Sequence, residues 1–319
     1  MALTSGGGTS KLTLLDLSSN FIDSLANNTF ADHQRLEVLI LDNNFLLRVD
    51  TELFAPLQEL RALHLSDNRI ARLPEDVVRG NTNLKSLEIS GNPLRTLRTG
   101  FLASDSLQLL DASGCGIKEI DSGAFVYLTA LKTLKLSRNY LKRISDGSFG
   151  FPLNNALTSL DLSNNYLERL PVAAVAELSS LSSLELSKNL MRNLSSCDGH
   201  FSDFPQFSYL DLAENPIEHL RDATCLRYAN GTKFVLLSGC NLAEFPWMLF
   251  DDLPLLEQVV LDDNPITAVA AAADEGEETS RDHRYLRKLS LKFMEQLREV
   301  GGWCGCCCCV LLKPPRVLG

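Results

Sequence analysis

The sequence predicts a repeat solenoid in which each coil contributes one short strand, and three observations support this. The pattern Leu-x-x-Leu-x-Leu-x-x-Asn recurs along most of the 319 residues. Its copies lie 23 to 26 residues apart, and the apolar positions keep the same offsets in each copy. Self-similarity at a fixed period of this size indicates units that pack only against their neighbours. The length of the chain therefore reflects the number of coils and not the number of globular domains.

The strand in each coil is predicted from a period of two. In the first copy Leu15 and Leu17 alternate with Asp16 and Ser18, so the leucines share one face. Few residues remain before the next copy, which favours turns and short 3₁₀ segments in the return path. A phenylalanine ten residues after the anchor recurs there and predicts a stack of rings: Phe30, Phe54, Phe125, Phe149 and Phe250.

The last position of the pattern, which we call the anchor, has a physical role. The turn after each strand leaves backbone groups without ladder partners, and a side-chain amide can bond to them. We expect the asparagines to join successive coils, and the two cysteine anchors to be buried and to soften their coils because S–H is a weak donor. The anchors are Asn20, Asn44, Asn68, Asn92, Cys115, Asn139, Asn165, Asn189, Asn215, Cys240 and Asn264.

These residues resemble the leucine-rich repeat family in its 24-residue form with a phenylalanine in the return path, which is typical of extracellular adhesion proteins and Toll-like receptor ectodomains. The resemblance implies an α/β fold, a right-handed horseshoe whose concave side carries a parallel sheet and whose convex side consists of turns and short 3₁₀ segments. It covers residues 11–270, which hold eleven coils.

Outside the solenoid the pattern predicts four further segments: a disordered segment at 1–10, an inserted polar loop at 271–284, a degenerate twelfth repeat at 285–300 and a cysteine-rich irregular tail at 301–319. Adjacent cysteines in the tail do not suit tetrahedral zinc. Three interpretations stay open for this tail: S-acylation, an altered reading frame, or an unstructured end without a role. No cysteine-rich cap precedes the first coil, and we expect the chain to continue upstream.

Composition and charge exclude several classes of function. The formal charge of −10 argues against binding to nucleic acid, which needs a basic footprint. The sequence has no glycine-rich phosphate loop, no paired metal histidines and no nucleophile elbow, so we expect no enzyme, no metal and no cofactor. It shows neither a signal peptide nor a membrane span, so membrane association would depend on missing or unrecognised segments.

Cysteines and sequons give secondary expectations. Cys197 and Cys225 lie in the return paths of neighbouring coils, so a disulfide between them is one alternative and two separately packed thiols the other. The loop from Cys197 to Asp203 has the wrong spacing for zinc. Sequons predict glycosylation in a secretory compartment; they begin at Asn27, Asn193 and Asn230.

The concave face is the candidate binding surface, because its strand positions project side chains in parallel rows. One row is acidic in its middle, and eight of its members are candidate binding residues: Asp16, His64, Glu88, Asp111, Lys135, Asp161, Glu185 and Asp211. The next row is mostly serine. An acidic row can steer a basic partner, although a solvated face needs no ligand at all.

Two hypotheses of function follow. The first is a protein-binding module within the ectodomain of a cell-surface or secreted receptor or adhesion glycoprotein, located outside the cell. The second is a cytoplasmic scaffold or adaptor that assembles proteins on the same surface. Both bind a protein ligand, and the compartment separates them.

Overall fold

A computed structural model describes most of the solenoid. The described residues are 10–145, 147–149, 153, 156–175, 178–194, 207–217, 220, 226, 229, 231–244, 253–266 and, as backbone, 288–290. The disulfide proposed between Cys197 and Cys225, the polar loop at 271–284 and the tail at 301–319 lie outside these residues.

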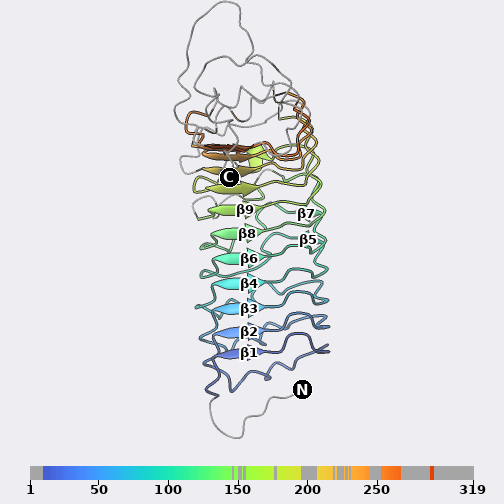
Figure 1. Cartoon of the computed structure of the whole chain (residues 1–319). Coiled ribbons are helices and arrows are strands. Elements are labelled where there is room, and N and C mark those ends of the chain that lie inside the picture. Colours follow the sequence, from blue (N-terminus) through green and yellow to red (C-terminus); the bar gives the residue numbers. More distant parts are fainter. Residues whose placement is uncertain are drawn as a thin grey trace, which may run out of the picture.

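One parallel sheet of twelve strands runs along the solenoid, with neighbours in chain order apart from β5 and β7, which lie elsewhere (Figure 1). The strands of this sheet are β1 (Leu14–Asp16), β2 (Val38–Ile40), β3 (Ala62–His64), β4 (Ser86–Glu88), β6 (Leu109–Asp111), β8 (Thr133–Lys135), β9 (Ser159–Asp161), β10 (Ser183–Glu185), β11 (Tyr209–Asp211), β12 (Phe234–Leu236), β13 (Gln258–Val260) and β14 (Lys288–Ser290). The predicted solenoid with a strand in every coil is confirmed.

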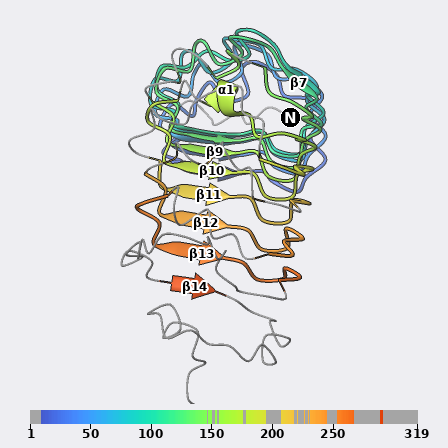
Figure 2. The same ribbon diagram turned by 90° about the horizontal axis from the view of Figure 1, so that it is seen from above.

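The stack of strands is curved. Figure 1 spreads β1 to β9 along one direction, and a quarter turn in Figure 2 spreads β9 to β14 along another. Hydrogen bonds hold neighbouring strands about 4.8 Å apart. On the opposite side of the coils the ring centroids of Phe30 and Phe54 lie 6.4 Å apart and those of Phe125 and Phe149 lie 6.1 Å apart. Because neighbouring coils are spaced further apart at the rings than at the strands, the solenoid bends toward the sheet. The sheet therefore lies on the concave side.

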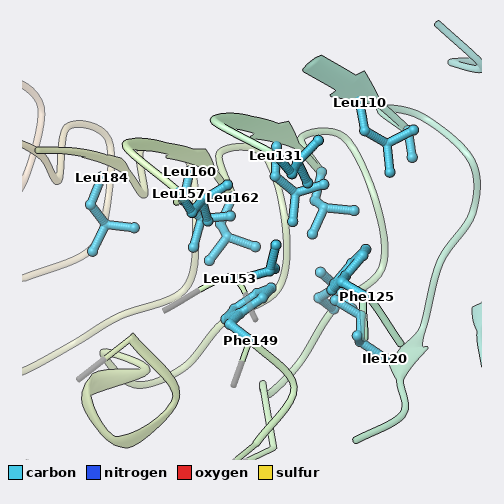
Figure 3. Close-up of a cluster of buried hydrophobic side chains, with 14 of the residues drawn as sticks. Leu110, Ile120, Phe125, Leu131, Phe149, Leu153, Leu157, Leu160, Leu162 and Leu184 are labelled. Carbon is cyan, nitrogen blue, oxygen red and sulfur yellow. The ribbon is translucent and has the colours of Figure 1, made fainter. Parts of the chain in front are cut away.

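The core lies between the sheet and the return paths. In the twelve-stranded sheet, the middle residue of each strand from β2 to β13 is buried, and the leucines of the pattern pack behind it. Figure 3 shows one part of this cluster, where Leu110, Leu131 and Leu160 lie above the rings of Phe125 and Phe149. Because every coil adds the same buried set, the core is continuous along the solenoid.

The return paths differ in two places from the predicted turns and 3₁₀ segments. β5 (Thr96–Leu97) pairs with β7 (Glu119–Ile120), and α1 (Val172–Val175) forms one helical turn. The coil containing β5 has the shortest spacing between anchors, 23 residues from Asn92 to Cys115. Extended backbone spans more length per residue than a turn does, which accounts for β5. At α1, Pro171 precedes an alanine-containing segment, and such a proline favours a helix start.

The anchor asparagines join neighbouring coils as predicted. The Asn139 amide donates to the carbonyl oxygen of Ala112 in the preceding coil at 3.0 Å and to that of Leu136 at 2.9 Å. Its oxygen accepts the backbone N–H of Ile117, also in the preceding coil, at 2.9 Å. The same arrangement recurs at buried Asn44, Asn68, Asn165, Asn189 and Asn215.

The cysteine anchors are buried, as expected, and reproduce half of this arrangement. The Cys115 thiol donates to the carbonyl oxygen of Ile89 at 3.2 Å, but a thiol offers no oxygen for the preceding coil. The N–H of Leu94, which would need that oxygen, instead donates to the carbonyl of Asn92 at 2.9 Å across Pro93. Proline fixes φ near the value that such a three-residue turn needs.

The same compensation occurs at the other cysteine anchor. The N–H of Ile217 donates to the carbonyl of Asn215 at 2.7 Å across Pro216, ahead of Cys240. Asn-Pro also occurs at Asn264-Pro265, and the next copy of the pattern has Met294 at its anchor. Thus, wherever the anchor is not asparagine, the preceding anchor is an asparagine followed directly by proline. This pairing was not recognised in the sequence.

Candidate binding surfaces

The third residues of the strands form a single row on the concave face, which we call the central row. Parallel register places its members beside one another in this order: Asp16, Ile40, His64, Glu88, Asp111, Lys135, Asp161, Glu185, Asp211, Leu236 and Val260. All eight candidate residues therefore lie in one line across the sheet. This register was predictable without knowledge of any side-chain contact, because the strand residues keep the same offset from the anchor in every copy of the pattern.

Four aspartates of the central row also stabilise the end of their own strand. The carboxylate of Asp111 accepts the N–H of Ser113 at 2.9 Å, and that of Asp161 accepts the N–H of Ser163 at 2.9 Å. Asp16 and Asp211 make the same local contact. At Asp16, the bonds from Ser18 lower the pKa of the carboxyl. These contacts give the recurrent Leu-Asp-Leu-Ser sequence a structural reason that is independent of any ligand.

The first half of the row is partly neutralised by local pairing. His64 Nδ1 lies 3.2 Å from a Glu88 carboxylate oxygen and 4.0 Å from one of Asp42, and Lys135 Nζ lies 3.8 Å from one of Asp111. Partial burial raises the pKa of Asp42, although its bond from the N–H of Ser66 opposes this. The carboxylates here thus have positive or polar neighbours on the sheet itself.

The second half of the row has an acidic centre at Glu185, which the charge of Lys135 offsets only in part. Partial burial, together with the carboxylates of Asp161 and Asp211 on the neighbouring strands, raises the pKa of Glu185. Burial and the carboxylates of Asp211 and Glu185 raise the pKa of Tyr209, which is the first residue of β11 and lies on the same face. An incoming cation would relieve this repulsion, so Glu185 is the point of the row with the most to gain from a basic partner.

The Glu185→Gln variant is expected to be slightly more stable than the native chain at neutral pH, by less than about 1 kcal/mol. A carboxyl with a raised folded pKa is charged at a cost, so it reduces stability as pH rises through its titration range. The gain should vanish in acid, where the native carboxyl is protonated. Urea unfolding at neutral pH and at acid pH measures this difference; a larger gain in acid would contradict it.

Two aromatic residues on the concave face were missed in the sequence. Tyr209 and Phe234 open neighbouring strands β11 and β12 and are only partly buried. The period of two that revealed the central row also places these first strand residues on the same face. Tyrosine is enriched among the residues that contribute most binding energy at protein interfaces.

The remaining predicted sites are placed only in part. Asn27 and Asn193 are exposed, and Asn230 lies outside the described residues. The Cys115 and Cys240 thiols are free, and burial raises the pKa of each to about 12, which leaves them uncharged at neutral pH. Within the described ranges there is no cluster of metal-ligating side chains, and no helix there is long and apolar enough to cross a membrane.

Comparison with known proteins agrees with this architecture. A family described as "Leucine rich repeat" matches residues 10–70, 34–94, 58–117, 105–152 and 155–217. The crystal structure of the TLR13–ssRNA13 complex superposes with a TM-score of 0.56 at 21% identity, which is a likeness of fold. The match covers 81% of this chain and 44% of that one, so this chain spans less than half the length of that protein. No curated protein sequence gives a significant match.

Proposed function

Because this chain belongs to the leucine-rich repeat family, we propose that its concave sheet binds a protein ligand that presents a basic surface. Repeats of this family are typically protein-interaction modules. The observation that carries the proposal is the acidic centre at Glu185, flanked by Asp161 and Asp211 in strict register. Hydrogen-bonded strands hold these groups in place, so binding orders little of the surface.

Tyr209 and Phe234 extend this site. They lie on the two strands that follow β10, so an acidic centre adjoins a partly exposed aromatic pair. Such a combination suits a partner that has lysine or arginine side chains around an apolar contact. The charged groups would set orientation and association rate, and the rings would supply buried area.

We further propose that the chain acts within the ectodomain of a cell-surface or secreted receptor or adhesion glycoprotein. The sequon asparagines Asn27 and Asn193 support this location, because both side chains are exposed on the surface. Digestion of the native protein with a glycosidase tests it. A mobility shift is expected, whereas an unmodified protein that fractionates with the cytosol would favour the scaffold hypothesis.

The binding proposal can be tested with a library of random peptides displayed on phage and selected on the native chain. Lysine- and arginine-rich peptides are expected. They should lose binding to the double variant Glu88→Lys with Glu185→Lys, since reversal replaces attraction by repulsion across the row. These two glutamates make none of the strand-end backbone contacts of the aspartates, so the fold is spared.

A matched control reverses two exposed glutamates elsewhere, Glu59→Lys with Glu75→Lys, and should leave peptide binding intact. The proposal fails if the selected peptides have no basic bias. It also fails if they bind both double variants as tightly as the native chain.

A further inference from the structure

Basic side chains gather on one lateral side of the solenoid, although the chain as a whole is acidic. We define the lateral face as the first, third and fourth residues after each anchor from Asn44 to Asn189. It has two acidic residues, Glu119 and Glu168, and nine exposed basic ones: Arg48, Arg69, Arg72, Arg95, Lys118, Lys142, Arg143, Arg169 and Arg192. None of the nine is in an ion pair within the part of the chain described here.

Backbone hydrogen bonds hold this face in register. In five of these coils the residue after the anchor donates its N–H to the preceding coil, as Arg69 does to the carbonyl of Leu46 at 2.9 Å and Tyr140 does to that of Ile117 at 2.7 Å. The row from the Asn44 coil to the Asn189 coil crosses six gaps of about 4.8 Å, which gives roughly 29 Å. The net charge of −10 therefore conceals a long positive strip on one side and an acidic row on the concave face.

Aromatic rings interleave with these cations. The Arg69 guanidinium lies 4.4 Å from the centroid of the Phe45 ring, and the rings of Tyr140 and Tyr166 lie 5.8 Å apart. Tyr140 and Tyr166 are exposed. Exposed rings beside cations are the elements from which proteins build platforms for unpaired nucleic-acid bases.

The row of rings has a gap in its centre. The coil before Tyr140 has Gly116 in the ring position, and Gly91 and Gly114 also lack side chains, which leaves an open depression of about 550 Å³. Pro93 and Tyr140 line it from the coils on either side, and Arg95 and Lys118 lie at its walls. A Cβ placed on Gly116 would lie 3.8 Å from the Tyr140 ring, so the ring borders the empty position directly.

We propose that the lateral face binds single-stranded nucleic acid, with one base in the gap over Gly116 against Tyr140 and with phosphates on Arg95, Lys118 and the cations along the strip. A flat ring with an anionic group attached fits this gap and its walls. Duplex nucleic acid keeps its bases stacked inside and cannot fill the gap, and a sulfated polysaccharide needs the cations but has no planar base for the ring. The strip is longer than one nucleotide, which favours a strand.

Fluorescence anisotropy of the whole chain with a short labelled oligothymidylate at low salt tests this proposal. Tyr140→Ala is expected to weaken binding about tenfold, because it removes the ring on which a base stacks. Tyr140→Phe should bind like the native chain. Arg95→Glu with Lys118→Glu should weaken binding and reduce the slope of log affinity against log salt by about 1.4, since each phosphate contact contributes roughly 0.7.

Two further variants separate the site from general effects. Gly116→Asn fills the gap without backbone strain, because Asn241 has a φ of 59° at the equivalent position after Cys240. This variant keeps all the rings and cations of the lateral face and should still weaken binding. Lys85→Glu with Lys132→Glu makes the same change of charge at the other end of the strands and should leave binding unchanged. Equal affinity of Tyr140→Ala and the native chain, tighter binding of heparin or duplex, or no binding at low salt would each overturn the proposal.

Discussion

Replacing Asn139 by alanine is expected to lower the free energy of unfolding by about 3 kcal/mol. The variant leaves the carbonyl of Ala112 and the N–H of Ile117 without the partners that the amide provides, whereas the carbonyl of Leu136 keeps its bond from the Asn165 amide. Asn139 is 2% exposed, so water replaces few of these bonds. Urea unfolding followed by circular dichroism gives the change in free energy, and hydrogen exchange at Ile117 localises it.

Asn139→Cys provides a graded comparison. A thiol at this position can donate to a carbonyl of the preceding coil, as Cys115 does, but the N–H of Ile117 lies after Gly116 and has no Asn-Pro turn to receive it. The free energy of unfolding of Asn139→Cys should therefore fall between those of the native chain and of Asn139→Ala. Asn83→Ala, at an exposed asparagine, should change stability by less than about 0.5 kcal/mol. Equal stability of Asn139→Ala and Asn83→Ala would contradict the role assigned to the anchors.

The regular middle of the solenoid was predictable because one physical requirement repeats in each coil. Strand positions such as Leu134 and Leu160 face the core whatever their neighbours are, so spacing alone set the register of the central row. The role of Asn139 also followed from counting backbone groups that a turn leaves unpaired. Neither inference needed a view of distant contacts.

Features that depend on two coils together were harder to read. The turn across Pro93 becomes meaningful only when Cys115, 22 residues later, is known to lack an amide oxygen. The strand pairing of β5 with β7 likewise depends on the shortened spacing of one coil. Net charge concealed the basic residues for a related reason, because it sums the concave row and the lateral face, which point to different sides of the solenoid. Rows after the anchor, read like the strand rows, would have revealed the cations.

Replacing Phe125 by alanine is expected to cost about 4 kcal/mol of unfolding free energy, the largest effect of a single substitution proposed for this chain. Phe125 is 2% exposed, and its ring stacks on that of Phe149 at 6.1 Å (Figure 3). The variant loses the transfer free energy of the ring and leaves a cavity, because hydrogen-bonded coils on both sides limit collapse. Urea unfolding of the native chain and of the variant measures the loss.

Phe125→Leu is the informative control, because the preceding coil already has Leu102, fully buried, in the same position. The return path there accepts a leucine, so this variant should lose only about 1 kcal/mol. A large loss in Phe125→Leu would mean that the ring stack itself, rather than filled volume, stabilises the convex side. The distance between neighbouring coils on the convex side would then also decrease. The solenoid bends because the ring centroids lie 6.1 to 6.4 Å apart there, whereas the strands lie closer together. A change of curvature in small-angle X-ray scattering would accompany that outcome.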